Sequence, residues 1–257
     1  MTSILETRGL TKTFGAITAA ADLHVSLAEH SVVGLIGGNG AGKTTFINLV
    51  TGYLAPTAGT IRFDGRDITG SSPRRVTRLG LCRSFQIPQL FDSLTAWENL
   101  LVGLGIVAHG SGAFRSALEG RRPKEAADEV LARFRLGGWR DAPASVMPEG
   151  VRKLLDIALA MVVRPRLLLL DEPTSGVSAE EKFALMDLVL AAIQAERTAV
   201  LFVEHDMEIV RRYTERVLAF YEGRVIADGP PAKVLDDPDV RKYVVGLEAP
   251  RAGGTPC

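Results

Sequence analysis

Short, continuously apolar runs recur along the chain, at residues 31–37 (SVVGLIG), 166–171 (RLLLLD) and 198–205 (TAVLFVEH). These runs are short and do not alternate between polar and apolar residues, so each predicts a strand buried on both faces of a sheet. Helix-like segments separate them, which is the pattern of βαβ units and a largely parallel sheet. Ligands bind at the carboxyl ends of the strands in such sheets, so the polar residues that end these runs are the first candidates for a site.

The pattern changes on either side of these runs. Before residue 31 the segments are short and partly alternating, and residues 59–68 (GTIRFDGRDI) carry a DG turn, which together predict an antiparallel β subdomain. Residues 88–150 show helical spacing broken by a glycine-rich stretch. We therefore expect a core with a β subdomain over 1–87 and 151–230, a helical insertion over 88–150, and a C-terminal helix and mobile tail over 231–257.

Composition narrows the class of protein. A length of 257 residues suits one α/β domain with insertions, and 46% hydrophobic residues argue against disorder over most of the chain. The 30 Lys and Arg balance the 30 Asp and Glu, so no global positive field attracts nucleic acid. A local group of arginines is interpreted as a solvated helix face or an interdomain rim: Arg74, Arg75, Arg78 and Arg83.

The cysteines and the apolar runs indicate in which cellular compartment the chain is expected. Only Cys82 and Cys257 occur, which provides no disulfide framework and fits a reducing compartment. The N-terminus lacks the pattern of a signal peptide, and no apolar run approaches the ~18 residues of a membrane span. The chain is therefore expected neither to be exported nor to cross a membrane by itself.

A glycine-rich loop follows the first buried strand. Its sequence GGNGAGKTT satisfies G-x-x-x-x-G-K-[ST], with the lysine at Lys43 and the hydroxyl at Thr44. Backbone N–H groups of such a loop bind phosphate oxygens, the lysine adds a positive charge, and the hydroxyl is a ligand for Mg²⁺. A glycine-rich turn with an incidental lysine is the alternative, which the preceding strand and following helix disfavour. The candidate nucleotide-binding residues are Gly37, Gly38, Asn39, Gly40, Ala41, Gly42, Lys43, Thr44 and Thr45.

Two carboxylates end the second buried strand. Asp171 can hold Mg²⁺, and Glu172 can orient or deprotonate the water that attacks a γ-phosphate. Adjacent carboxylates are costly unless a metal or a phosphate-bound lysine neutralises them. An acidic helix N-terminus remains the alternative for either residue alone.

These residues resemble the ATP-binding cassette (ABC) family, the motor subunits of ABC transporters, over roughly residues 3 to 247. The resemblance implies a P-loop NTPase (RecA-like) α/β core with an antiparallel β subdomain and an inserted helical subdomain. It also implies that Gln86, in SFQIPQLF, joins the Mg²⁺ or water shell, that His205, in FVEHD, senses the γ-phosphate, and that Phe14 stacks on adenine. A lone histidine or phenylalanine more often belongs to a core, so these assignments depend on the family.

The segment MPEGV at 147–151 stands where the family usually has LSGGQ, the signature that contacts nucleotide held by the opposite subunit. Only Gly150 matches, and its N–H can still face an anion at the start of the next helix, with Arg152 and Lys153 adding positive charge. Glu149 is expected to point away, because two like charges ~4 Å apart at a dielectric of ~20 repel by about 4 kcal/mol. A proline at position 148 is similar to the LPYGQ of branched-chain amino acid importer cassettes.

Two other positions also depart from the ABC family pattern, while three segments resemble the importer subfamily. Ser178 stands where the dimer-contact loop usually has Asp or Asn, and Leu159 where an arginine is common. The segments DDPDVRKYVVG, EHDMEIV and FDSLTAWENLLVG resemble the branched-chain amino acid and urea importer cassettes. SLTAWENLLVG is equally compatible with an amphipathic helix packed in its own domain.

The resemblance implies that the chain is an ATPase subunit of an importer. Its expected cofactors are ATP and Mg²⁺. Its expected partners are a second cassette, identical or paralogous, integral membrane permease subunits, and indirectly a solute-binding protein. A groove lined near Gln86 to Phe91 is expected to receive a helix of the permease. The expected location is the cytoplasmic face of the inner membrane, peripherally bound, with no nucleic-acid partner. The alternatives are a soluble non-transport ABC ATPase and a cassette that binds ATP but scarcely hydrolyses it.

Overall fold

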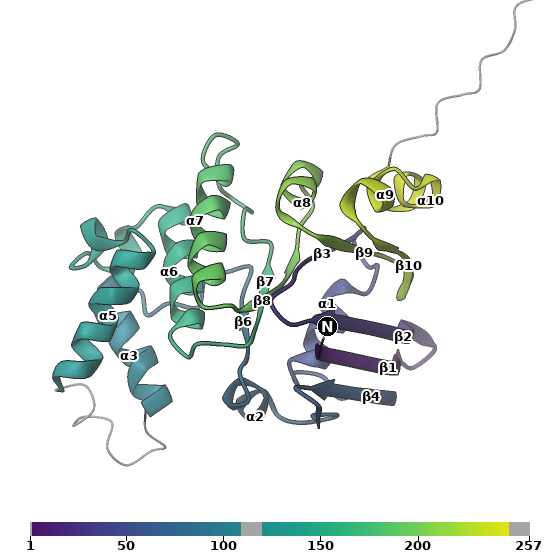
Figure 1. The fold of residues 1–257 in the computed structure, drawn as a ribbon, viewed down its shortest axis with the longest axis horizontal. Helices are drawn as coiled ribbons and strands as arrows, with labels where there is room; N and C mark the ends of the chain where they lie inside the picture. Colours follow the sequence, from purple (N-terminus) through teal and green to yellow (C-terminus); the bar gives the residue numbers. More distant parts are fainter. Residues whose placement is uncertain (1, 109–119, 247–257) are drawn as a thin grey trace, which may run out of the picture. The chain divides into compact units, whose positions relative to one another are not determined.

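The structure is a computed structural model that describes residues 2–108 and 120–246. It divides into two compact units (Figure 1). Unit 1 comprises Met1–Thr2, Ala28–Ser31 and Pro73–Phe202, and unit 2 comprises Ser3–Leu27, Val32–Ser72 and Val203–Cys257. The predicted mobile tail, Cys257 and most of the predicted glycine-rich stretch lie outside the described residues.

Unit 2 contains the predicted antiparallel β subdomain. Its sheet has the order β2-β1-β4-β5 and consists of β1 (Ser3–Phe14), β2 (Ile17–Ala28), β4 (Ala58–Phe63) and β5 (Arg66–Asp67). β4 pairs antiparallel with both β1 and β5. The DG turn joins β4 to β5, and Asp64 and Gly65 both have positive φ, as a two-residue hairpin turn of this kind requires.

Unit 2 also contains the first buried strand of the sequence. The strands run in the order β10-β9-β3, with β3 (Val32–Gly37) parallel to β9 (Arg216–Tyr221) and β9 antiparallel to β10 (Arg224–Gly229). Every residue of β3 is buried, which explains why its sequence is apolar without alternation. The helical elements are α1 (Lys43–Val50), α8 (Met207–Tyr213), α9 (Pro231–Leu235), α10 (Pro238–Val240) and the π-helical η3 (Arg241–Val245).

Unit 1 holds the other buried strands, in the order β8-β7-β6. They are β6 (Leu81–Ser84), β7 (Leu167–Asp171) and β8 (Ala199–Val203). β6 and β7 are parallel, with Cys82 opposite Leu168 and Ser84 opposite Leu170. β7 is buried up to Leu170, and Asp171 is its first partly exposed residue, so the strand delivers an acid at its carboxyl end as predicted.

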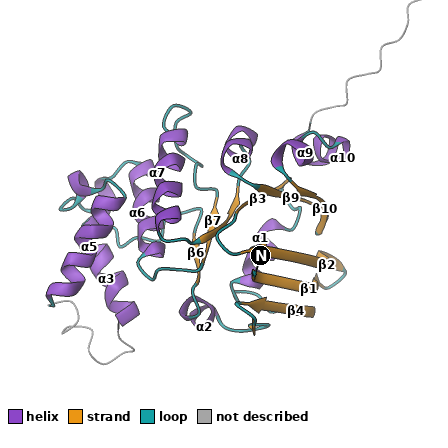
Figure 2. Ribbon diagram, in the orientation of Figure 1, coloured by secondary structure: helices purple, strands orange, loops and turns teal. Residues whose placement is uncertain are grey.

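Helices make up most of the rest of unit 1 (Figure 2). They are α2 (Pro73–Arg78), α3 (Ala96–Ala108), α5 (Arg121–Arg133), α6 (Glu149–Met161) and α7 (Lys182–Ala195), with the 3-10 turns η1 (Gly137–Trp139) and η2 (Ala144–Val146). α3 begins after a capping box, in which Glu98 N donates to Thr95 Oγ1 at 3.2 Å and Thr95 N donates to Glu98 Oε2 at 2.8 Å. α3 contacts α5 and α6, and α6 also contacts α7, β6 and β7, so α6 is central to this unit.

Candidate functional site

The glycine-rich loop after β3 is shaped by close backbone contacts within unit 2. Gly42 has a φ of +100°, and a Cβ at this position would lie 2.5 Å from the carbonyl oxygen of Ala19. A Cβ on Gly37 would lie 2.7 Å from the carbonyl oxygen of Phe220. Both approaches are too close for any side chain, so the fold itself requires glycine at these positions of the motif.

The loop opens directly into α1. Gly42 is the N-cap of α1, and Phe46 N donates to Gly42 O at 2.9 Å. Of the predicted nucleotide-binding residues, Gly38, Asn39, Gly40, Thr44 and Thr45 are at least partly exposed, while Gly37, Ala41 and Lys43 are buried. The helix N-terminus, with its outward N–H groups and positive dipole end, therefore lies next to the loop as an anion-binding site requires.

Lys43 lies against the loop that precedes it. Its Nζ donates to the carbonyl oxygens of Gly37 at 2.6 Å and Gly38 at 3.1 Å, and the residue is 7% exposed. The ammonium is therefore held beside the loop amides, which suits its predicted role.

Phe14 and His205 are both exposed in unit 2. Phe14 ends β1 with half of its surface exposed, and Lys12 Nζ lies 5.1 Å from its ring centroid, so it is not a core residue. His205 directly precedes Asp206, whose carboxylate caps α8 by accepting from Glu208 N at 2.9 Å. The preceding residue, Glu204, is 3% exposed and accepts from His205 N at 3.1 Å; sequence reasoning missed this buried acid.

In unit 1, Asp171 forms an ion pair with Arg83. Arg83 Nη2 donates to Asp171 Oδ2 at 2.5 Å, and the two side chains are only 10% and 14% exposed. The interpretation of Arg83 as part of a solvated face or rim is therefore wrong, because β6 and β7 are adjacent parallel strands that bring the two residues together. Arg83 supplies a neutralising cation that the sequence pattern did not reveal.

The structure brings two other predicted site residues together in unit 1. Gln86 Nε2 donates to Glu172 Oε2 at 2.8 Å. Glu172 has a φ of +50°, which is uncommon for a residue with a side chain, although seven other non-glycine residues in the described part of the chain also have a positive φ. This backbone conformation could not be predicted from the sequence.

The segment at 147–151 forms the start of α6. Pro148 is the N-cap, Glu149 is the first helical residue and exposed, and Gly150 is partly buried. The Cγ atom of Glu149 lies 3.3 Å from the position that a Cβ on Gly176 would occupy, in the loop that follows Glu172. The expectation that Glu149 points away from nucleotide remains a prediction.

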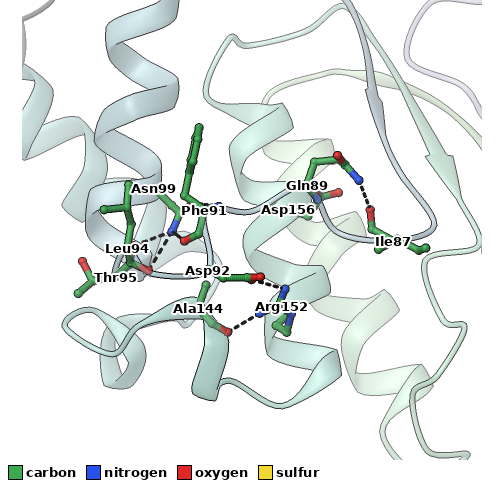
Figure 3. Close-up of polar contacts among 10 residues, drawn as sticks. All are labelled: Ile87, Gln89, Phe91, Asp92, Leu94, Thr95, Asn99, Ala144, Arg152 and Asp156. Atoms are coloured by element: carbon green, nitrogen blue, oxygen red, sulfur yellow. Dashed lines mark hydrogen bonds and ion pairs between the residues drawn. The ribbon is translucent and has the colours of Figure 1, made fainter.

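Arg152 and Lys153 differ from expectation, because both are bound within unit 1. Arg152 Nη2 donates to Asp92 Oδ1 at 2.7 Å and its Nη1 donates to the carbonyl of Ala144 at 2.5 Å (Figure 3). Lys153 is 4% exposed, and its Nζ donates to Glu172 O at 2.9 Å. Their charges therefore stabilise loops of the unit.

The other departures from the family pattern have local explanations. Ser178 Oγ accepts from Glu181 N at 3.3 Å and donates to Glu181 Oε2 at 3.0 Å, which is the arrangement of a helix cap before α7. Leu159 packs against Gly103 of α3, where its Cδ2 lies 2.8 Å from the position of an added Cβ. An apolar side chain at 159 thus fits the contact between α6 and α3.

Asn99 of α3 organises the loop that precedes this helix. The side chain is fully buried; its Oδ1 accepts from Phe91 N at 2.9 Å, and its Nδ2 donates to the carbonyls of Phe91, Leu94 and Thr95 at 3.1, 3.2 and 2.9 Å (Figure 3). The same loop exposes Ile87 and Phe91 by 74% and 55%. A well-held loop thus presents two large apolar side chains to solvent.

Asp156 of α6 is a buried carboxylate that sequence reasoning missed. Burial raises the pKa of its carboxyl, while hydrogen bonds from Gln89, Ser84 and Phe85 and the charge of Lys153 oppose that rise. The signal in the sequence was an acid at a position where the helix is otherwise apolar.

The predicted Mg²⁺ ligands have suitable donor chemistry. Thr44 has an exposed hydroxyl, Gln86 has an amide oxygen and Asp171 has a carboxylate, and hard divalent cations prefer oxygen ligands. Within residues 2–108 and 120–246, no group of three or more His, Cys, Asp or Glu residues is placed to hold a metal ion.

No helix in the described part of the chain is long and apolar enough to cross a membrane.

Comparison with known proteins identifies relatives over most of the chain. A family model described as ABC transporter matches residues 20–175. The branched-chain amino acid transport ATP-binding protein BraF of Pseudomonas aeruginosa is 36% identical over 249 residues, covering 95% of this chain and 98% of BraF. LivG of Escherichia coli, with the same description, is 33% identical over 252 residues and covers 95% of this chain and 98% of LivG.

Solved structures agree with this similarity. The ADP conformation of MJ1267, an ATP-binding cassette of an ABC transporter, has a TM-score of 0.83 at 30% identity, covering 94% of this chain and 98% of that one. A nucleotide-free ATP-binding cassette from an ABC transporter has a TM-score of 0.84 at 29% identity, covering 96% of this chain and 100% of that one. The predicted P-loop NTPase fold is confirmed.

Proposed function

This chain belongs to the ABC transporter family, and from that premise we propose that it is the ATP-hydrolysing subunit of an importer for branched-chain or other hydrophobic amino acids. The observation that carries the proposal is the similarity along nearly the whole chain to transport ATP-binding proteins for branched-chain amino acids. A soluble, non-transport ABC ATPase is less well supported, because the chain is neutral and the described residues hold a single cassette.

For nucleotide binding, we assign the triphosphate to the loop of residues 37–45 and the N-terminus of α1. Lys43 would neutralise the β- and γ-phosphate oxygens, and Phe14 would stack on the adenine. The exposure of the Phe14 ring supports this role, since a buried ring could not stack on a ligand.

For hydrolysis, we assign Glu172 to orient or deprotonate the attacking water and Gln86 to hold Glu172 in place. The hydrogen bond between these side chains supports the pairing. His205 would contact the γ-phosphate and stabilise the charge that develops on it, and Gly150 would offer its N–H to nucleotide held by a second cassette.

Mg²⁺ would be held by Thr44, Gln86 and Asp171, and when bound it would neutralise charge on the transferred phosphoryl group. Arg83 would fix the Asp171 carboxylate in orientation through their ion pair.

The proposed partners are a second cassette, identical or paralogous, integral membrane permease subunits, and indirectly a solute-binding protein. The exposed Ile87 and Phe91 side chains support docking of a permease helix on the loop that Asn99 holds. Such a subunit would act peripherally at the cytoplasmic face of the inner membrane.

The test is ATP hydrolysis and solute uptake by the complex that copurifies with this chain, reconstituted in proteoliposomes. Glu172→Gln should lower turnover at least 100-fold, while Glu180→Gln, the same change at an exposed acid eight residues further on, should have no effect. Leucine, isoleucine or valine with the binding protein should stimulate hydrolysis, whereas aspartate and lysine should not. Unchanged turnover in Glu172→Gln would overturn the hydrolytic role, and stimulation by polynucleotide or ribosomes instead of solute would overturn the transport role.

A second candidate function is a cassette that binds ATP but hydrolyses it weakly. It is favoured by Pro148, which caps α6 without the hydroxyl and N–H that a serine would offer. Pro148→Ser should raise turnover if this candidate is correct, and it should leave turnover within twofold if the proline is a subfamily feature.

A further inference from the structure

Two buried charged side chains lie on the same face of α6. Lys153 and Asp156 are 4% and 6% exposed and three residues apart, so both project from adjacent turns of the helix. Charged groups are buried at a high free-energy cost unless hydrogen bonds and opposite charges compensate them. Their partners therefore indicate what these residues do.

Asp156 binds the loop that contains Gln86. Its Oδ2 accepts from Phe85 N at 3.3 Å and its Oδ1 accepts from Gln89 N at 2.9 Å, while the Ser84 hydroxyl also bonds the carboxylate. Gln89 Nε2 in turn donates to Ile87 O at 3.0 Å, which closes the loop on itself (Figure 3). Because each carboxylate oxygen binds a different N–H, one side chain fixes both ends of the segment that flanks Gln86.

Lys153 binds the backbone of Glu172. Its Nζ donates to Glu172 O at 2.9 Å, and Glu172 is the residue whose φ of +50° is sparsely populated for a side-chain-bearing residue. Such a conformation persists only when surrounding contacts hold it. The buried ammonium supplies one of those contacts.

The two sets of contacts meet at one hydrogen bond. Gln86 lies in the loop that Asp156 binds, and its side chain donates to the carboxylate of Glu172. The backbone of Glu172 is in turn bound by Lys153. The contacts form a closed chain from α6 to the loop, from the loop to Glu172, and from Glu172 back to α6. α6 is also the helix that starts with the signature segment at 149–150.

We propose that Lys153 and Asp156 are positioning residues that fix Gln86 and Glu172 to the helix bearing the signature segment, so that a displacement of this helix moves both residues together. The inference rests on the proposed role of Glu172 in hydrolysis. It adds two buried residues, and it names the contacts through which they act.

The test is Asp156→Asn in the full chain. Asparagine retains one acceptor oxygen, but its NH₂ group would face the second backbone N–H, so one bond to the loop is lost. We expect hydrogen exchange of the Phe85 or Gln89 amide to rise at least tenfold in the nucleotide-free protein. In the complex, kcat should fall at least tenfold while the KM for ATP changes less than twofold.

Three further variants complete the design. Asp156→Glu keeps both acceptor oxygens and should restore amide protection and most of kcat, whereas Asp128→Asn, the same change at an exposed site on α5, should alter neither. Lys153→Met keeps the apolar stem but removes the donor, and should lower kcat without changing the KM, which provides a second route if Asp156→Asn does not fold.

The outcomes distinguish this proposal from the proposed function. Faster amide exchange with unchanged kcat in Asp156→Asn would overturn the positioning role, and so would a lower kcat with unchanged exchange. If Glu172→Gln leaves turnover unchanged, the hydrolytic assignment fails instead, and the exchange measurement still reports whether Asp156 holds the loop.

Discussion

Replacing Asn99 by aspartate tests how the loop that exposes Ile87 and Phe91 is held. The change keeps an oxygen that accepts from Phe91 N, but it puts a second oxygen where Nδ2 now donates to three carbonyls at 2.9 to 3.2 Å. The two N–H bonds that an amide can make are lost, at about 1 kcal/mol each, and leaving buried carbonyls without a donor adds about 1–3 kcal/mol. We therefore expect a loss of about 3–5 kcal/mol in the free energy of unfolding at pH 8.

The same variant should become more stable as the pH falls. Burial against carbonyl oxygens disfavours the charged form, so the pKa of the new carboxyl should rise above the unfolded value of about 3.9. A proton on the folded carboxyl then supplies one donor to a carbonyl. This contribution is complete below the unfolded pKa and is lost as the pH rises through the folded pKa, so the variant should be less destabilised at pH 5.5 than at pH 8.

Urea unfolding at both pH values, followed by tryptophan fluorescence, measures the effect, since Trp97 lies in the same helix. Gln194→Glu is the matched control, because it makes the same amide-to-carboxyl change at an exposed position of α7 and should alter stability by less than about 0.5 kcal/mol. If Asn99→Asp is as stable as the wild type at pH 8, or if its destabilisation does not change with pH, the buried hydrogen-bond argument is refuted.

Two further predictions concern unit 2 and the buried thiol. Gly42→Ala should abolish nucleotide binding in calorimetry and destabilise the protein, because the Cβ would meet Ala19 O at 2.5 Å, whereas Gly65→Ala, with a φ of +71° and open space around it, should lose only about 1 kcal/mol and keep binding. Burial raises the pKa of the Cys82 thiol from 9.0 to about 12. The unfolded chain therefore loses this proton first, and stability should fall as the pH rises from 9 towards 12, by up to about 1.4 kcal/mol per pH unit. Urea unfolding at pH 8 and 10 should show a shallower pH dependence in Cys82→Ala, and equal slopes in both proteins would contradict the assignment.

Local pattern was sufficient for the elements that carry the candidate site. Burial on both faces explains why β3, β8 and β7 up to Leu170 appear in the sequence as continuous apolar runs. The DG turn was recognisable because its residues tolerate positive φ. The glycine-rich loop could also be predicted, because its spacing, the strand before it and the helix after it are all local features.

The hydrogen-bond and ion-pair partners of the site's polar and charged residues could not be predicted from the sequence. Arg83 and Asp171 are 88 residues apart, and Gln86 and Glu172 are 86 apart, so only the pairing of β6 with β7 and the path of the following loop bring them together. Arg152 and Lys153 were expected to add positive charge near an anion at the start of their helix. Instead, both side chains bind to loops of their own unit.

The sequence by itself thus determined three of the buried strands, the position of the glycine-rich loop and the acid at the end of β7, because each depends on neighbours along the chain. Tertiary structure alone decided that Arg83 pairs with Asp171, that Asn99 holds the exposed loop, and that Gln86 bonds to Glu172. The physical reason is that a buried polar group must find its partner in space, and packing, not sequence distance, selects that partner.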